Sequence, residues 1–408
     1  MTMRPTPLAT LGAALAVVLS WAAPAHCSLP AMFRYETPPG PVQVVAGSQH
    51  DSVQEYRLSW SSGFVSPYPE NNLVRAWLFQ PTADSLWPAV IVLHSWRAKD
   101  FRIEKELSRR LGQQGMAALL LVLPYHGERA PPGFASGSLM VTASPGRIVD
   151  SIRQAIMDVE SAIDWLETQP QIMPDGIGIV GISLGAIVAD LAVSLEPRLK
   201  AGVSIVGGGD LPYILWNSLL TLGIKSRMID SGISLESLRR SLHSIDPLTY
   251  ASPALSNHLL MINGADDPVV PRRAAEEFWR AAGRPSIVWL PTGHFGPFLT
   301  KGRLFQVTAD YLNGQFQGKP IQLGQQAIRA ITLKVVAIYD RREKLRLGIV
   351  GEIASLSDSD RFSADLGVTT KTPFAGVSWH GLEGLDAGLL VSIRGGPVRP
   401  FLVARLTF

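Results

Sequence analysis

Cysteine and charged residues are both scarce in this sequence. Cys27 is the only cysteine among 408 residues, so no disulfide forms within the chain and the hydrophobic core has to stabilise it. Only 17% of the residues are charged, the formal net charge is +3, and no Lys/Arg run is dense enough for a nucleic-acid patch. We therefore expect no nucleic-acid partner. No H-E-x-x-H or Gly-rich phosphate-binding motif occurs where it would function, so we expect neither a metal nor a nucleotide cofactor.

The N-terminus has the features of an export signal. Arg4 precedes a short apolar stretch that ends in the small-x-small sequence Ala23-Pro24-Ala25. The stretch is shorter than the roughly 20 residues that a membrane-spanning helix needs. We expect cleavage after Ala25 and an exported protein, either periplasmic or associated with the outer membrane. His26 stands where a lipoprotein signal would carry a small residue, which disfavours lipid attachment at Cys27.

Residues 26–52 form an N-terminal lead, and residues 53–319 are expected to form one α/β domain. The segments SVQEYRLSW and LVRAWLFQP are typical of two strands joined by a polar loop. Short apolar runs then alternate with helical patterns, of which the clearest runs from about Ile148 to Glu167. Such alternation predicts a doubly wound, mostly parallel sheet that is buried on both faces.

Two segments depart from this alternation. Residues 209–255 carry two helical patterns, and we interpret them as a helical cap inserted over the strand ends. Its apolar residues suit a hydrophobic acyl or aromatic substrate, but they serve equally well as a core of the cap: Leu211, Tyr213, Leu215 and Trp216. Residues 320–408 form short alternating segments between tight turns, which predicts a smaller antiparallel β domain.

The sequence GISLG at Gly181–Gly185 follows a strand pattern and opens a helical one. In that context G-x-S-x-G is typical of a nucleophile elbow, a tight turn that holds the hydroxyl of Ser183 above the sheet. The alternative is an ordinary turn with an incidental serine. A nucleophilic serine needs a base and an acid, in the chain order Ser, Asp, His for this fold. Asp266 and Asp267 follow one later strand pattern, and His294 follows the next.

With these three positions, the region from about Val53 to Phe316 resembles the α/β-hydrolase family, in particular its dienelactone-hydrolase-like and exported carboxylesterase branches. The resemblance implies that Ser183 is the nucleophile and His294 the base. It favours Asp267 over Asp266 as the acid, because the family's acid stands three residues after Gly264 and before V-P.

The same resemblance implies an oxyanion hole made by the backbone N–H groups of Leu184 and of Trp96. Where relatives commonly have His-Gly, this sequence has His94-Ser95, so Ser95 stays an alternative donor. We interpret His94 as a structural residue. His126, in a loop similar to one of the dienelactone-hydrolase-like relatives, is expected to shape the rim of the pocket.

The C-terminal segment allows two interpretations. Its last strand pattern alternates apolar residues and ends on Phe408, which resembles the closing strand of bacterial outer-membrane barrels. The alternative is a soluble sheet whose apolar face packs on the hydrolase domain or on a partner chain.

The sequence thus predicts a serine hydrolase that cleaves small-molecule carboxylic esters through an acyl-enzyme, without a cofactor. A peptidase or an acyltransferase would use the same three residues. A further alternative, from a different class, is a non-catalytic binding protein on a hydrolase scaffold.

Overall fold

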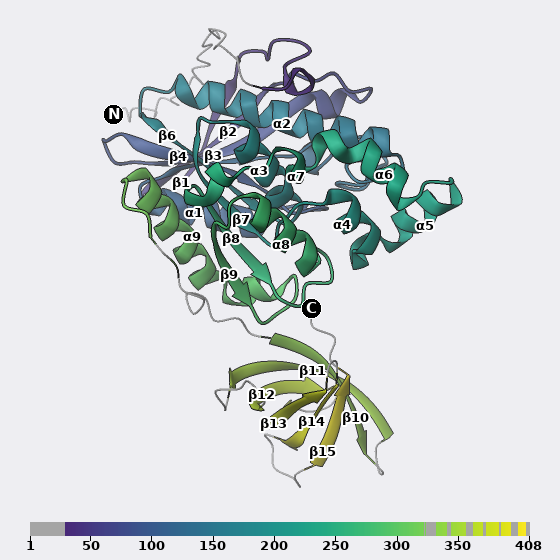
Figure 1. Cartoon of the computed structure of the whole chain (residues 1–408). Helices are drawn as coiled ribbons and strands as arrows, with labels where there is room; N and C mark the ends of the chain where they lie inside the picture. Colours follow the sequence, from purple (N-terminus) through teal and green to yellow (C-terminus); the bar gives the residue numbers. More distant parts are fainter. Residues whose placement is uncertain are drawn as a thin grey trace, which may run out of the picture.

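The computed structural model describes residues 29–321 and 323, and then six strands between residues 332 and 404 (Figure 1). The predicted export signal, Cys27 and Phe408 lie outside the described residues. The described helices include none that is both long and apolar enough to span a membrane.

The first sheet has nine strands in the order β1-β2-β3-β5-β4-β6-β7-β8-β9. β1, β2, β3 and β5 pair antiparallel, whereas β5, β4, β6, β7, β8 and β9 are parallel neighbours. The strands are β1 (Gln43–His50), β2 (Val53–Ser61), β3 (Leu73–Pro81), β4 (Trp87–Leu93), β5 (Ala117–Leu121), β6 (Ile172–Ile182), β7 (Leu199–Ile205), β8 (Leu259–Gly264) and β9 (Ser286–Leu290). The predicted fold class, a mostly parallel α/β sheet, is confirmed.

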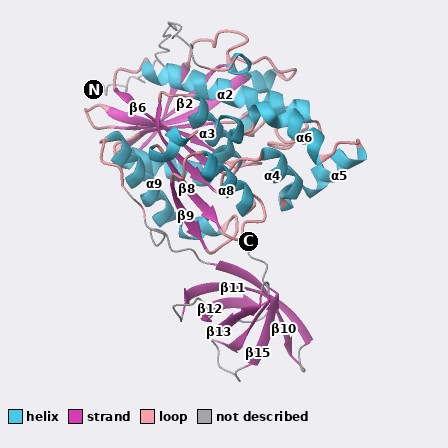
Figure 2. Ribbon diagram, in the orientation of Figure 1, coloured by secondary structure: helices cyan, strands magenta, loops and turns pink. Residues whose placement is uncertain are grey.

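Helices cover both faces of this sheet (Figure 2). On one face α1 (Arg102–Gln113) and α9 (Lys301–Phe316) pack against Val90, Val92 and their neighbours. On the other face lie α2 (Pro145–Glu167), α3 (Leu184–Leu195) and α8 (Arg272–Ala281). The central strands are buried along their whole length because both of their faces are covered, which explains their uninterrupted apolar sequence.

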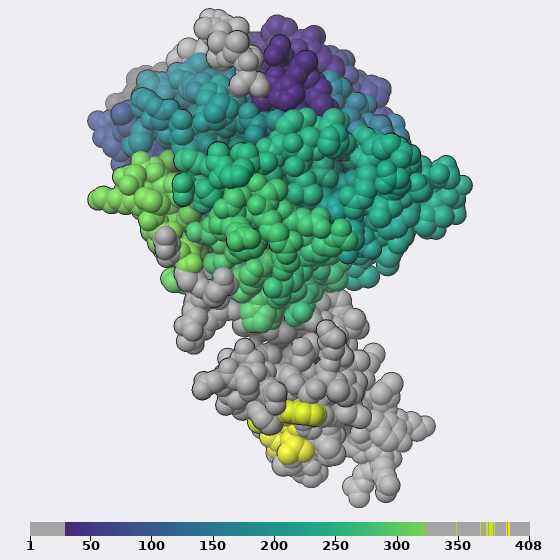
Figure 3. Space-filling model, viewed as in Figure 1, coloured from purple at the N-terminus to yellow at the C-terminus, as the bar shows by residue number. Residues whose placement is uncertain are grey.

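Residues 206–258 connect β7 to β8 and form a group of short helices. They are α4 (Leu211–Asn217), α5 (Leu222–Asp230), α6 (Leu235–Leu242) and α7 (Pro247–Tyr250), with short 3-10 turns at Leu219–Thr221, His243–Ile245 and Pro253–Asn257. Of the four apolar residues singled out above, Leu211 and Leu215 are buried in the core and Tyr213 and Trp216 are partly buried. Figure 3 shows this segment, in teal and green, forming one side of the surface.

The predicted lead over residues 26–52 contains a strand that the sequence reading missed. β1 adds an edge strand beside β2, and its eight residues are all exposed. An edge strand has one neighbour and no buried face here, so its sequence carries no apolar alternation from which to predict it. A short 3-10 turn at Ala31–Phe33 precedes it and buries Phe33.

Six antiparallel strands form a second sheet, which closes through pairing of β10 with β15. They are β10 (Thr332–Asp340), β11 (Lys344–Ser355), β12 (Phe362–Thr369), β13 (Pro373–Leu382), β14 (Leu385–Ser392) and β15 (Arg399–Ala404). Its exposed apolar side chains include Val368, Val377, Trp379, Leu389 and Val391. Val377 and Leu389 are direct partners in the pairing of β13 with β14.

Candidate active site

Ser183 lies between β6 and α3, at the carboxyl end of the parallel strands. Its backbone has φ 56° and ψ −115°, a conformation that L residues rarely adopt. The flanking glycines make this turn sterically feasible. A Cβ on Gly181 would lie 2.1 Å from the carbonyl oxygen of Gly185, and one on Gly185 would lie 2.5 Å from the carbonyl oxygen of Leu93. The tight turn holds Ser183 above the sheet, 8% exposed.

His294 and Asp267 reach Ser183 from loops that follow β9 and β8. The hydroxyl of Ser183 lies 2.8 Å from His294 Nε2, and His294 Nδ1 lies 2.7 Å from Asp267 Oδ2. With Nδ1–H donating to the carboxylate, Nε2 is free to accept the proton of the serine hydroxyl. This Ser–His–Asp chain of hydrogen bonds has the connectivity required of a nucleophile, a base and an orienting acid.

The carboxylate that contacts His294 is that of Asp267 and not that of its neighbour Asp266. The second oxygen of Asp267, Oδ1, accepts the backbone N–H groups of Val269 at 2.7 Å and Val270 at 2.9 Å. Both carboxylate oxygens are therefore fixed, and the side chain is buried. Asp266 is exposed, and its backbone N–H bonds to the carbonyl of Thr292. The structure thus brings together Ser183, Asp267 and His294 as the sequence predicts.

The segment His94–Arg97 after β4 contacts the elbow, since a Cβ on Gly185 would also lie 2.7 Å from the carbonyl oxygen of His94. Within it, the Ser95 N–H donates to Glu104 Oε1 at 3.2 Å and the Arg97 N–H donates to His126 Nε2 at 3.1 Å. Among the described residues neither the Trp96 N–H nor the Leu184 N–H has a hydrogen-bond acceptor. The Leu184 N–H adjoins Ser183 and the Trp96 N–H belongs to the segment that contacts the elbow, so both are candidate donors to an oxyanion.

His94 and His126 are fully buried and their rings lie 4.7 Å apart. His94 Nδ1 bonds the carbonyl of Ser95 at 2.9 Å and its Nε2 accepts the Leu123 N–H at 3.0 Å, so it is structural, as the sequence reading held. Burial, with the Arg129 charge also contributing, lowers the pKa of His126 from 6.5 to about 4. Burial also places the pKa of His94 well below its ordinary value. Both rings are therefore neutral at pH 7.

An ion pair anchors the loop that carries His126. Arg129 and Asp158 are fully buried, with Nη1 2.7 Å from Oδ2. Arg129 also donates to the carbonyls of Asn71 and Val122, and Asp158 accepts the hydroxyl of Ser62. Burial raises the pKa of Asp158, against the opposing effect of the Arg129 charge. The guanidinium thus ties the loop to α2 and to the segment before β3.

Glu104 is a site residue that the sequence reading missed. It lies on α1 in the helical repeat of Leu107 and Leu111 and is only 3% exposed. A glutamate three and seven residues before buried leucines lies on the buried face of a helix, and that spacing is the signal that could have identified it. Burial raises the pKa of its carboxyl.

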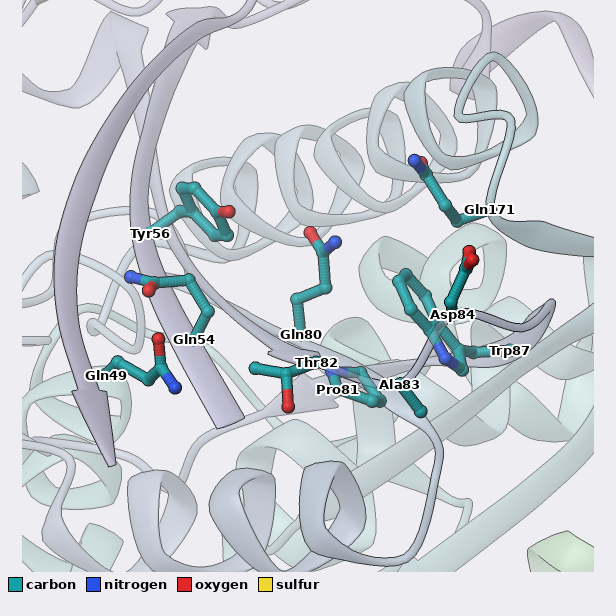
Figure 4. Close-up of a pocket in the computed structure, with 10 residues that line it drawn as sticks. All are labelled: Gln49, Gln54, Tyr56, Gln80, Pro81, Thr82, Ala83, Asp84, Trp87 and Gln171. Atoms are coloured by element: carbon teal, nitrogen blue, oxygen red, sulfur yellow. The ribbon is translucent and has the colours of Figure 1, made fainter. Parts of the chain in front are cut away.

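A cleft at the other end of the sheet is unrelated to these residues. It has a volume of about 370 Å³. Its lining residues include four glutamines and Trp87, the first residue of β4 (Figure 4). The parallel strands run from this end toward Ser183, so the cleft lies at their amino ends and the serine at their carboxyl ends. Among the lining residues, Asp84 is the only one with a carboxyl or imidazole group. The cleft therefore offers no pair of groups for acid–base chemistry. In the part of the chain that the structure describes, no group of three His, Cys, Asp or Glu residues is arranged to hold a metal ion.

The sheet order and the helices on both of its faces give this chain an α/β-hydrolase fold. Two solved structures share the fold: the acetyl xylan esterase from Paenibacillus sp. R4 and acetyl xylan esterase 1 from Thermoanaerobacterium sp. JW/SL YS485. Both have a TM-score of 0.53 and 18% identity. The first match covers 65% of this chain and 88% of that one, and the second covers 66% and 87%.

Part of the chain also matches a family of known sequences. Residues 74–232 match the model of the Dienelactone hydrolase family, which confirms the resemblance predicted from the sequence. An uncharacterized protein of Mycobacterium tuberculosis (strain ATCC 25618 / H37Rv) is 25% identical over 271 residues, covering 60% of this chain and 61% of the relative. The chain therefore spans about three fifths of the length of that relative.

Proposed function

We propose that this protein is a hydrolase of carboxylic esters that works through an acyl-enzyme, with Ser183 as nucleophile, His294 as base and Asp267 as the orienting acid. The observation that carries the proposal is the unbroken chain of hydrogen bonds from Ser183 through His294 to Asp267. The match to the dienelactone hydrolase family and the fold shared with two proteins named as acetyl xylan esterases support an ester as the substrate.

In this mechanism Ser183 Oγ attacks the acyl carbon while His294 Nε2 takes the hydroxyl proton. The carbonyl oxygen becomes an oxyanion, which the N–H groups of Leu184 and Trp96 stabilise, together with the positive end of α3. The tetrahedral intermediate then expels the alcohol, which takes the proton from His294. A water molecule, deprotonated by His294, attacks the acyl-enzyme and releases the acid, and the serine regains its proton.

Turnover of p-nitrophenyl esters of increasing acyl length by the mature protein and by Ser183→Ala tests the proposal. We expect hydrolysis by the wild type, loss of it in the variant, and a chain-length optimum that measures the acyl pocket. A fluorophosphonate probe distinguishes the alternatives. Labelling without ester turnover would favour a peptidase or an acyltransferase, and absence of both from folded protein would favour a binding protein and overturn the proposal.

We further propose that the mature protein is exported and that its second sheet associates with the outer membrane. Besides the predicted export signal, five exposed apolar side chains on neighbouring strands support this: Val368, Val377, Trp379, Leu389 and Val391. Apolar side chains are more stable in contact with lipid than in contact with water. Fractionation should place the protein with the outer membrane, released by detergent and not by high salt. Recovery entirely in the soluble periplasm would overturn the proposal.

A further inference from the structure

The segment Ser95–Arg97 offers three consecutive backbone N–H groups near the elbow, and two of them already have acceptors. Glu104 on α1 accepts the Ser95 N–H, and also lies 3.4 Å from the Ser95 hydroxyl. His126, from the loop after β5, accepts the Arg97 N–H. Only the central N–H, that of Trp96, has no acceptor among the described residues. Both acceptors are side chains from elsewhere in the chain.

From this we propose that Glu104 and His126 are positioning residues that hold Ser95 and Arg97 and thereby present the Trp96 N–H to the oxyanion. The proposal rests on the proposed function and deepens it. It also decides between the two donors that the sequence left open, because an N–H already donating to a carboxylate cannot serve the oxyanion equally well.

The conformation of Arg97 shows why the segment needs to be held. Its φ is 62°, in the left-handed region that is unfavourable for a residue with a Cβ. The bond from its N–H to His126 Nε2 offsets part of this strain, and Arg97 also stacks on the Trp96 ring, with its guanidinium carbon 4.5 Å from the ring centroid. The Trp96 indole N–H donates to the carbonyl of Gly137 at 2.8 Å.

The protonation state of His126 suits this role. Its Nδ1 lies 2.9 Å from the carbonyl oxygen of Pro124, so Nδ1 carries the proton and Nε2 is left as an acceptor. The groups that face the ring are the buried His94 and the Arg129 guanidinium, and the Arg129 charge opposes a positive charge on the ring. Gly137 lets the ring come close, because a Cβ there would lie 2.3 Å from His126 Nε2.

Paired substitutions separate positioning from mere packing. His126→Phe keeps a ring without an acceptor, whereas His126→Gln places an amide oxygen near the position of Nε2. Glu104→Leu removes the carboxylate, and Glu104→Gln keeps an acceptor oxygen. The matched control is Glu106→Leu, on the exposed side of the same helix, where Glu106 pairs with Lys301. Circular dichroism and thermal melting establish that each variant is folded.

We expect kcat to fall about 10- to 100-fold in His126→Phe and Glu104→Leu with KM changed less than about threefold, since an oxyanion donor acts in the transition state. The glutamine variants should recover most of the loss, and Glu106→Leu should match the wild type. An alkylboronic acid forms a tetrahedral adduct on the serine, and its inhibition constant should rise by the factor by which kcat falls. If the wild type is active and kcat is unchanged in His126→Phe and Glu104→Leu, the positioning role is overturned and the proposed function is not.

Amide hydrogen exchange over residues 94–98 gives a readout that needs no turnover. In Glu104→Leu the Ser95 amide should exchange at least about tenfold faster while the Arg97 amide is unchanged. In His126→Phe the Arg97 amide should exchange faster by the same factor while the Ser95 amide is unchanged. Unchanged rates would overturn the proposal. A folded wild type that exchanges as expected yet hydrolyses no ester would overturn the proposed function, and the positioning role with it.

Discussion

The two halves of the candidate site are held in different ways. Ser183, His294 and Asp267 are linked by their own side chains, and each follows a strand of the same sheet. The opposing segment, His94–Arg97, contributes backbone groups, and its shape depends on side chains from α1 and from the loop after β5. Chemistry that resides in side chains is visible in a sequence motif, whereas a backbone donor is defined only by what surrounds it.

The largest effect should come from the side-chain half. Ser183→Ala and His294→Ala should each lower kcat by about 10⁴-fold or more, and the double variant should lose little further, because the groups act as a unit. Asp267→Asn should lose about 10⁴-fold, since the amide favours the wrong imidazole tautomer. Steady-state kinetics measure these losses. Asp266→Asn is the matched control, and a loss there comparable to that of Asp267→Asn would contradict the assignment of the acid.

The next effect concerns the buried ion pair of Arg129 and Asp158, which anchors the loop that carries His126. Arg129→Met should lower the free energy of unfolding by about 3–5 kcal/mol, because it leaves the Asp158 carboxylate buried without its partner. Urea denaturation measures the change. Arg129→Met combined with Asp158→Leu should be less destabilised than Arg129→Met alone. Arg57→Met, at an exposed ion pair with Glu128, serves as the control and should change stability little. Equal losses at both arginines would refute the role of burial.

The smallest effect is a pH dependence carried by His126. Its pKa is about 4 in the folded chain and about 6.5 when unfolded, so the unfolded chain alone gains the proton between these values. The contribution of His126 to stability is therefore present above pH 6.5 and declines by about 3 kcal/mol as the pH falls to 4.

His126→Gln has no such titration. The stability of the wild type relative to this variant should fall across that window, as measured by urea denaturation at each pH. The buried carboxyls of Glu104 and Asp158, whose pKa values are raised, and the neutral His94 are common to both proteins and cancel in the comparison. A difference that does not vary with pH would show that His126 is not held neutral.

Much of the fold could be predicted because burial leaves a direct trace in the sequence. Strands covered on both faces, such as β4 and β5, are continuous apolar runs, and α2 shows its buried face at helical spacing. β1 escaped prediction because it lies exposed at an edge. The catalytic candidates were predictable since the glycines around Ser183 and the residues after two strands stand at positions that the fold itself dictates.

The sequence by itself determined the parallel sheet and the serine on its tight turn, because these follow from local sterics and from periodic burial, and it placed Asp267 and His294 after two later strands. The family resemblance favoured Asp267 and Trp96, but only the tertiary structure shows that the Asp267 carboxylate reaches His294 and that the Trp96 N–H has no acceptor among the described residues. Those outcomes depend on contacts between residues far apart in the chain, as between Ser95 on one loop and Glu104 on α1, or Arg97 and His126. Such contacts have no period and no fixed spacing, so no local pattern encodes them.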